Sequence, residues 1–555
     1  MPNWVKLFEG GVLEKCGTNV GTMRELAEAV SKEAKESVST DAIFNAHKRH
    51  RQRLGLKKSL TEYFGKGPEK VVKQPKVKPE DIYYKLSRDR RREVKKAKKF
   101  IITSAMNNCP LDEKVWASVE NYAKENDASI IVIPVRYKNP TGWTSMEENQ
   151  RAMEDAWWPD EVEPYATDEC VKLHEHLWVM GHVRVQATAV TPLSGLEALS
   201  KHASAVFGHA NLQMKMVATP QKKLPKLMYT TGSVSKPYYS DSRAGVKGEF
   251  HHGMGAVVVE LDGPRFHARA VVADRAGGFY DLNKYYGPKG VKKSKATLAL
   301  ITGDEHAMFN DKRCRGATYD NKDSIVNTLK PAKIVRHDIF DGYSVSHWNR
   351  TDPVIQFSKH KEGHHKLEEE LKTTLKFLEE TTPKWAENLI VSSNHDDFLI
   401  RWMKSVNAPI QEPWNARLWH ELWGVVLDSV EFKEHGVSHV DPFASWIKKH
   451  VNVPCTFLGS DSDYRVADVA VGLHGDKGTN GSRGTINQFA KLGVKTVIGH
   501  SHTPGIKHGC YQVGTSSTLK LDYTKGPSSW AHCHAVIYPN GKRQLIFVVN
   551  GHWKA

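Results

Sequence analysis

The sequence has few cysteines and no long apolar segment. Its seven cysteines are scattered along 555 residues, and no two form a CxxC pair. This usage predicts reduced thiols, as in a cytoplasm, and argues against a zinc ribbon. No apolar run approaches the about eighteen residues of a membrane span. The first residues, MPNWVKLFEGG, lack the basic and apolar segments of a secretory signal, so we expect the protein to stay where it is made.

Acidic residues are outnumbered by basic ones. The chain has 79 Lys and Arg against 63 Asp and Glu, which gives a formal net charge of +16. Such a field favours a polyanionic partner such as nucleic acid, although solubility alone is the plainer interpretation. Because the basic residues cluster along the chain, we favour the polyanion. The length predicts two or three globular domains.

Residues 1–60 have the pattern of a small helical domain. Thr22 would cap one helix, and a second helical run begins near Thr40. Two short helices across a tight turn suggest a helix-turn-helix, whose second helix would offer three side chains to DNA: Arg49, Arg51 and Arg53. A basic, solvated helix would look the same. Residues 61–97 are rich in Lys, Arg, Pro and Glu and are expected to form a basic linker.

Residues 98–295 have the pattern of an α/β domain. Apolar runs from Phe100 and over residues 129–135 enclose a helical stretch that begins at Glu113, which gives the order strand, helix, strand. Further short apolar runs alternate with turns rich in Gly and Pro, and no catalytic motif occurs among them. His174 and His176 look like a ligand pair, but ordinary surface histidines are the better interpretation. We expect this region to cap a functional site in residues 296–555 or to position substrate there.

Five apolar, β-branched runs follow in residues 296–555, separated by helical segments. Such runs are typical of parallel strands buried on both faces. Each run is followed by residues of the types that bind metals: Asp304 and His306; Asp338 and Asp341; Asn394 and His395; His474; His500 and His502. Ligands converge where strands of an α/β sheet end, so these groups are expected to meet.

This mixture of ligands suits a pair of divalent ions. Two ions about 3.5–4 Å apart need one shared carboxylate, together with imidazole, carboxylate and amide ligands that leave positions open. A water that bridges two such ions loses a proton near neutral pH, which would supply a hydroxide nucleophile. Oxygen-rich mixed sites accept manganese, iron or zinc, and we expect two ions, with Mn²⁺ preferred.

The five groups of metal-type residues, in this order along the chain, resemble the motifs of the calcineurin-like metallophosphoesterases. The resemblance covers residues 296 to about 530. The resemblance implies a β-sandwich flanked by helices in the C-terminal half. It also implies that a first metal binds Asp304, His306 and His502, that a second binds Asn394, His474 and His500, and that Asp338 bridges them. His395 would protonate the leaving oxygen, and Asp341 would orient His395. The sequence departs from the family at His337, which stands where the second motif normally has glycine.

The second motif, DIFDGYSVSHWNRTDP, resembles the SbcD-type double-strand-break nucleases, because phosphatases have Arg-Gly after the second acid. Residues 347–365 carry Arg350 and Lys359, which could hold a DNA backbone, or this segment could be a solvated loop. We therefore expect a metal-dependent DNA nuclease that hydrolyses phosphodiester bonds. A phosphomonoesterase, either protein phosphatase or nucleotidase, and a non-catalytic DNA-binding protein are the alternatives.

Size, N-terminal extension and nuclease-like motifs together resemble the proteins with which virulent tailed phages of the T five-like group destroy host DNA. That resemblance implies early action on double-stranded host DNA in a bacterial cytoplasm, without a membrane. The SbcD-type resemblance implies a homo-oligomer, either a dimer or a larger assembly.

Overall fold

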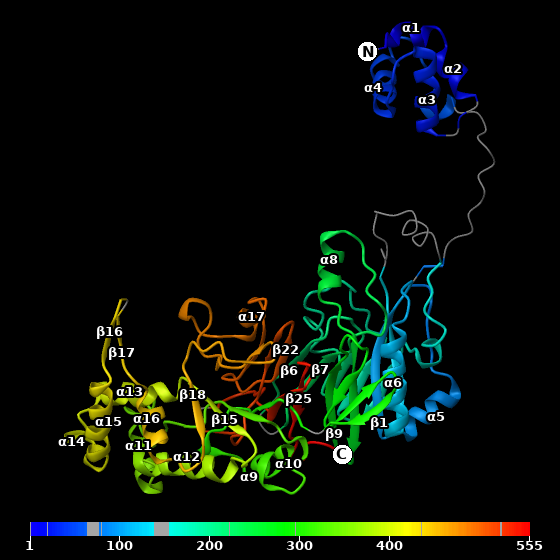
Figure 1. The fold of residues 1–555 in the computed structure, drawn as a ribbon. Helices are drawn as coiled ribbons and strands as arrows, with labels where there is room; N and C mark the ends of the chain where they lie inside the picture. The colour runs from blue at the N-terminus through cyan, green and yellow to red at the C-terminus, as the bar shows by residue number, and fades with distance from the viewer. Residues whose placement is uncertain are drawn as a thin grey trace. The chain divides into compact units, whose positions relative to one another are not determined.

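The computed structural model describes residues 2–555 except 19, 21, 64–76, 79, 138–154, 221, 222, 295, 435, 522 and 523. The chain divides into two compact units, Met1–Val77 and Lys78–Ala555, which are both drawn in Figure 1. Within the described ranges, every helix is too short or too polar to cross a bilayer.

The N-terminal unit is a cluster of short helices. They are α1 (Trp4–Glu9), α2 (Val12–Gly17), α3 (Met23–Ala34), α4 (Thr40–His50) and a 3-10 turn, η1 (Leu60–Tyr63). Thr22 caps α3 by accepting the Glu25 N–H, and Ser39 caps α4 in the same way. Leu26 and Val30 of α3 pack against Ile43 of α4 in one small core. The two helices predicted from the capping and periodicity signals are therefore present.

A six-stranded sheet lies at the centre of the C-terminal unit, in the order β18-β15-β14-β13-β24-β25. Its strands are β13 (Ala299–Ile301), β14 (Lys333–Arg336), β15 (Glu387–Val391), β18 (Cys455–Leu458), β24 (Cys533–Ile537) and β25 (Arg543–Phe547). The four strands from β13 to β18 are parallel, and β24 and β25 are antiparallel to their neighbours.

A four-stranded sheet in the order β2-β1-β8-β9 lies next to β25. It consists of β1 (Lys99–Met106), β2 (Ala128–Val135), β8 (Gly255–Asp262) and β9 (Arg265–Val272). Parallel β1 and β2 are joined through α6 (Glu113–Asn126), as the strand, helix, strand pattern predicts. A small sheet follows, formed by β10 (Phe279–Asp281), β11 (Lys284–Gly287) and β12 (Gly290–Lys293).

The largest sheet has ten strands in the order β19-β20-β21-β23-β22-β6-β7-β5-β4-β3. Five come from the part of the chain before residue 295: β3 (Cys170–His174), β4 (Leu177–Met180), β5 (Ser204–Phe207), β6 (Met214–Val217) and β7 (Lys226–Thr230). The others are β19 (Arg465–Val466), β20 (Val469–Ala470), β21 (Lys495–Ile498), β22 (Gly505–Lys507) and β23 (Cys510–Gln512). Antiparallel pairing of β22 with β6 joins the two halves. Residues 98–295 and 296–555 therefore share one sheet and one compact unit.

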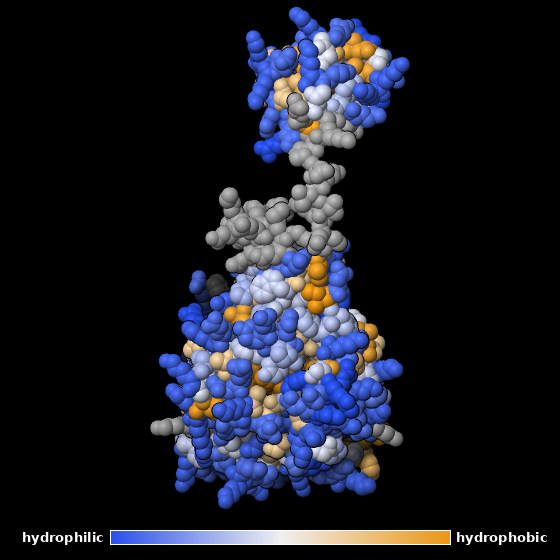
Figure 2. Space-filling view, turned by 90° about the vertical axis from the view of Figure 1, so that its right-hand side faces the viewer, coloured by the Kyte–Doolittle hydropathy of each residue, from blue (hydrophilic) through white to orange (hydrophobic). Residues whose placement is uncertain are grey.

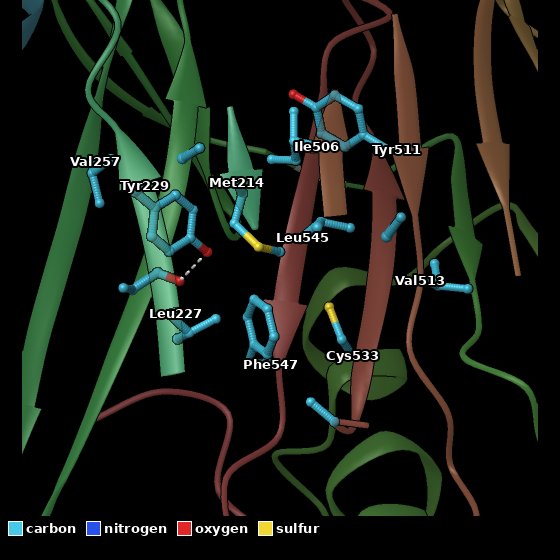
Figure 3. Packing of buried hydrophobic residues seen from close by; sticks show 14 of the residues in the cluster. Met214, Leu227, Tyr229, Val257, Ile506, Tyr511, Val513, Cys533, Leu545 and Phe547 are labelled. Atoms are coloured by element: carbon cyan, nitrogen blue, oxygen red, sulfur yellow. Dashed lines mark hydrogen bonds between the residues drawn. The ribbon is translucent and has the colours of Figure 1, made fainter. Parts of the chain in front are cut away.

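One hydrophobic core joins these three sheets. It contains Met214 and Tyr511 of the ten-stranded sheet, Leu545 of the six-stranded sheet and Val257 of the four-stranded sheet. Figure 3 shows these side chains pointing into the same layer, where the Tyr229 hydroxyl donates to a main-chain carbonyl. The large sheet thus packs face to face on the other two, and the fold is a mixed α/β arrangement.

Helices cover the opposite face of the six-stranded sheet. Trp402 and Phe443 pack against Ile334 and Ile390 in a second core. The helices in this segment are α9 (Lys312–Arg315), α10 (Ile325–Leu329), α11 (Pro353–Glu362), α12 (Leu367–Thr381), α13 (Asp396–Ser405), α14 (Ala408–Gln411), α15 (Ala416–Asp428) and α16 (Pro442–His450). A hairpin of β16 (Glu431–Lys433) and β17 (Gly436–Ser438) projects beyond them (Figure 1). Within the described ranges, the remaining α-helices are α5 (Arg88–Lys96), α8 (Arg243–Phe250) and α17 (Ile486–Phe489).

Charged side chains mostly stay at the surface, and the face drawn in Figure 2 is largely hydrophilic with scattered hydrophobic patches. Arg269 on β9 is an exception, because its side chain is only 1% exposed. Its guanidinium donates to both carboxylate oxygens of Asp281, at 2.7 and 2.9 Å, and to Glu260 at 2.8 Å. This buried cluster ties the four-stranded sheet to β10.

We expect Arg269→Met to lower the free energy of unfolding of the C-terminal unit by about 3–5 kcal/mol, because it leaves two buried carboxylates without their cation. Urea unfolding followed by tryptophan fluorescence would measure this loss. Arg265→Met is the matched control, since Arg265 lies on the same strand and its partner Asp262 is partly exposed. Its cost should stay below about 1 kcal/mol. Equal costs for both variants would contradict the assignment of Arg269.

Candidate metal centre

The candidate ligands follow strands of two different sheets. Asp304 and His306 come after β13, Asp338 follows β14, and Asn394 follows β15, three adjacent parallel strands. The other ligands come from the ten-stranded sheet, where β20 and β21 are also parallel, and they are His474, His500 and His502. The carboxyl ends of both sets of strands face one junction between the sheets, as the strand-end pattern predicts.

A first group of ligands surrounds Asp304. One ligand atom each of Asp304, His306, Asp338 and His502 lies within 4.8 Å of the others. Nε2 of His306 and Nε2 of His502 are 3.0 Å apart, and the latter is 3.1 Å from Oδ2 of Asp304. All four residues are buried. The fold therefore brings together the three ligands expected for a first metal.

The second group consists of His474, His500 and Asn394. Nε2 of His474 is 3.2 Å from Oδ2 of Asp338, whereas the nearest nitrogen of His306 is 3.9 Å from that oxygen. The His500 and His474 rings are 5.4 Å apart, and Nδ1 of His500 is 2.9 Å from Oδ1 of Asn394. Asp338 thus touches ligands of both groups, as a bridging carboxylate would.

His337 is part of this cluster, although the motif comparison gave it no role. Its ring is fully buried, and its Nδ1 lies 3.3 Å from Nδ1 of His474. His337, Asp304 and His474 also form a set of three residues, each of which offers one ligand atom within 4.8 Å of the other two. Burial, followed by the neighbouring His474, lowers the pKa of His337 to about 4, which leaves a neutral imidazole that can bind a metal. The only sequence signal was its replacement of glycine.

The unsatisfied polar atoms of the cluster fit a metal ion. Among the described residues, Oδ1 of Asp304, Oδ1 of Asp338 and Nε2 of His337 are buried and have no hydrogen-bond partner. Nδ1 of His502 is likewise buried and has no hydrogen-bond partner among these residues. Buried polar groups normally find partners, and carboxylate and imidazole together are the donors that Mn²⁺, Fe²⁺ and Zn²⁺ accept. A buried Asp and His cluster that could hold metal is therefore present.

Mutual electrostatics hold the cluster in a charged state. Burial alone would raise the pKa of Asp338, but the adjoining histidines, His474 first, hold it well below its usual range. Burial alone would lower the pKa values of His306 and His474, yet the carboxylates raise both to about 9. The carboxylates therefore favour positive charge at this position, whether imidazolium or metal ion supplies it.

The backbone at the ligands is strained. Four of them have left-handed φ angles: His306 at 45°, Asp338 at 43°, His500 at 71° and His502 at 57°. Non-glycine residues rarely adopt this conformation, and such strain concentrates at functional sites. Gly499 relieves crowding beside them, because a Cβ there would lie 2.3 Å from Oδ1 of Asp304. The glycine before His500 is thus required by the close approach of the Asp304 carboxylate.

A buried ion pair holds in place the loop that carries Asp304 and His306. Glu305 lies between Asp304 and His306 in sequence, and its carboxylate accepts two 3.0 Å hydrogen bonds from Arg336 of β14. The Tyr319 hydroxyl also donates to it. Main-chain bonds from Glu305 N and His306 N to the second motif add to this support, at 2.9 and 2.7 Å. The two motif loops therefore run side by side.

Asp341 and His395 are close to the cluster, but their contacts differ from the expected ones. The carboxylate of Asp341 accepts from Nδ1 of His306 at 3.0 Å and from Met308 N at 2.9 Å. His395 instead bonds through Nδ1, at 2.6 Å, to the main-chain carbonyl of Asp341. The His395 ring lies 4.9 Å from that of His306. Asp341 thus orients the candidate ligand His306 with its side chain and His395 with its backbone.

The residues expected to contact DNA differ in how exposed their side chains are. Arg49 and Arg53 are exposed, whereas Arg51 folds back to donate to the carbonyls of Leu56 and Lys57. Arg350 is half-buried and donates to Ser405. Lys359 is buried, and its ammonium donates to the Tyr343 carbonyl at 2.5 Å over the Tyr343 ring. Its position on α11 therefore does not offer Lys359 to a DNA backbone, contrary to expectation.

The fold and the cluster define a mixed α/β protein with a buried Asp and His site able to hold metal. The chain is 33% identical to Protein A1 of Escherichia phage T5 over 470 residues, which is 83% of this chain and 83% of that protein. It therefore belongs to the same family as that phage protein. No family model and no solved structure matches the chain.

We expect Mn²⁺ to stabilise the protein, because an ion that binds only the folded cluster shifts the unfolding equilibrium. At 100 times its dissociation constant the ion should add about 2.7 kcal/mol to the free energy of unfolding. Asp304→Asn and Asp338→Asn should lose most of this gain, whereas the exposed Asp461→Asn should keep it. Calorimetric titration and denaturant unfolding of metal-stripped protein would measure both quantities. Unchanged stability with Mn²⁺, Fe²⁺ and Zn²⁺ would contradict a metal site here.

Proposed function

We propose that the chain is a metal-dependent DNA nuclease that hydrolyses phosphodiester bonds with two divalent ions, preferably Mn²⁺, and that it degrades host DNA in the bacterial cytoplasm during phage infection. The observation that carries the proposal is the meeting of five predicted ligands in one buried cluster: Asp304, His306, Asp338, His474 and His502. Several polar atoms of these five are without partners, and the half-buried His500 and Asn394 lie beside them. Such a cluster is costly for a purely structural purpose.

The ligands divide naturally between two ions. Asp304, His306 and His502 would hold the first, Asn394, His474 and His500 the second, with Asp338 between them, and His337 adds a donor beside Asp304 and His474. Two ions at this position would lower the pKa of water and offset charge on phosphoryl oxygens. The exposed part of His500 and the half-buried Asn394 mark the accessible side of the cluster.

His395 is suited to move a proton to the leaving oxygen. Its Nδ1 is engaged by the carbonyl of Asp341, so the ring orientation is set and Nε2 is left to the substrate. Phe398 packs against the ring, with centroids 4.9 Å apart, which restricts its rotation. Because His395 is only partly buried, a phosphodiester can approach it. These contacts support a role for His395 as a general acid beside the metal site. A closed structural metal site would not need such a residue.

Charge favours DNA over a small monoester. The net charge of +16 attracts a long polyanion more strongly than a single phosphate group. Membership of a phage protein family supports DNA as the substrate, since it is an abundant polyanion of an infected cell. In the N-terminal unit, α4 exposes Lys48 and Arg49, and Arg53 is exposed just beyond it. We propose that this surface contacts phosphates.

We expect His395→Ala to lower the rate of cleavage of linear and circular duplex DNA in Mn²⁺ by about 10²- to 10⁴-fold, because general acid catalysis contributes that much. Metal binding should be retained, since His395 is outside both ligand groups. His420→Ala, which changes an exposed histidine of α15, is the control. Absence of cleavage by wild-type protein with any divalent ion would refute the proposal. Turnover of a monoester but not a diester model substrate would favour a phosphatase instead.

We expect removal of charge from the α4 surface to weaken duplex binding uniformly across sequences. The slope of log K against log salt should become less negative by about 0.9 for each phosphate that the variant no longer neutralises. The slope would be measured by fluorescence anisotropy in EDTA for a triple variant, Lys48→Ala, Arg49→Ala and Arg53→Ala. A second triple variant removes the same charge from elsewhere in the unit: Lys6→Ala, Arg24→Ala and Lys32→Ala. Equal slopes for both variants would exclude α4 as the surface that binds DNA.

A further inference from the structure

A large cavity opens at one end of the layer between the sheets, apart from the metal ligands. Its volume is about 980 Å³, at the upper end of the range for ligand pockets. Leu227 and Phe547, at the lower end of the core in Figure 3, form part of its apolar floor. Met216 and the partly buried ring of Phe266 also belong to that floor. The cavity therefore offers an apolar and aromatic surface within reach of solvent.

Basic side chains surround this floor. The lining includes six of them, namely Lys201, Lys223, Lys226, Arg265, Arg313 and Lys520, against one acid, Asp311. The Asp311 carboxylate is engaged as the N-cap of α9. Lys226 donates to two main-chain carbonyls, and Arg265 is paired with Asp262. Within the described part of the chain, the charged groups of the other four have no ion pair or hydrogen bond. The cavity rim thus carries uncompensated positive charge.

The cavity wall and the metal cluster are built from the same chain segments. Ala531, which lines the cavity, donates its N–H to the carbonyl of His502 at 3.3 Å. The adjacent Trp530 ring lies 4.1 Å from the His502 ring. Thr518, also in the lining, continues from Ser516, whose N–H donates to the Asp304 carbonyl at 2.7 Å. A strand held in the cavity would therefore lie close to the ligand loops.

We propose that this cavity binds an unpaired segment of a DNA strand, with one base against the apolar floor and neighbouring phosphates at the rim. Proteins that bind single strands combine aromatic platforms with a basic groove in this way. A paired base cannot reach the floor, because its faces are covered by its neighbours in the stack. The proposal rests on DNA being the substrate, and it adds that the enzyme engages a frayed or displaced strand.

The test is binding of a fluorescent single-stranded oligonucleotide to the full chain in EDTA, where cleavage does not interfere. The rim variant combines Lys223→Ala, Arg313→Ala and Lys520→Ala, three exposed side chains whose removal leaves no buried partner. We expect weaker binding and a salt slope less negative by about 0.7 for each phosphate that is no longer neutralised. Binding of a blunt duplex should change much less.

A matched variant controls for net charge. It removes three exposed lysines from the opposite side of the six-stranded sheet, on or beside α12: Lys366→Ala, Lys376→Ala and Lys384→Ala. This variant should bind the single strand as the wild type does. Equally weakened binding in the two triple variants, or unchanged binding in the rim variant, would overturn the proposal.

The floor is tested separately through Phe266. Phe266→Ala should weaken single-strand binding by roughly 5- to 150-fold, the range for removal of one base stack, and Phe266→Tyr should restore it. A mononucleotide that competes as well as the oligonucleotide would show a site for free nucleotides and would refute strand binding. If the rim and floor variants bind weakly while wild-type protein cuts no DNA, the cavity proposal survives and the nuclease proposal fails. If wild-type protein cuts DNA and these variants bind normally, the nuclease proposal survives and the cavity proposal fails.

Discussion

The burial of two carboxylates in one cluster is the constraint on which the site depends. Asp304 and Asp338 are each at most 2% exposed, and an isolated ionised carboxylate would be strongly disfavoured there. Imidazoles from four loops compensate, and the carboxylates in turn raise the pKa values of His306 and His474 to about 9 against the effect of burial. The left-handed ligand residues and the close approach of Gly499 are the conformational cost of crowding so many polar groups together. The buried pair of Glu305 and Arg336 supplies the rigid support behind them.

The ligands could be predicted because their positions follow from local pattern. Apolar β-branched runs mark buried parallel strands, and polar residues directly after them must lie at one edge. This reasoning located Asp304, Asn394 and His500 without knowledge of the helices between them. The five strands belong to two sheets, and the carboxyl ends of both sets face the same junction.

Side-chain contacts could not be predicted in the same way, because they depend on the path of loops. Asp341 was expected behind His395, but its carboxylate turns to His306, and only its carbonyl reaches His395. Lys359 was expected on the surface, but α11 packs so that its ammonium reaches the Tyr343 carbonyl. His337 was noted only as a substitution for glycine, and its role as a possible donor depends on where its ring points.

Residues 98–295 carry no catalytic motif, yet long-range strand pairing connects them to the part of the chain that holds the cluster. Pairing of β6 with β22 joins residues almost 300 positions apart, which no local periodicity reveals. The 470 residues matched to the phage protein exceed the length of residues 296–555, so the similarity extends into this N-terminal part of the sheet. Strands from both parts line the basic cavity and enclose one core. A segment without metal-type motifs is therefore structurally continuous with the cluster, through the pairing of β6 with β22.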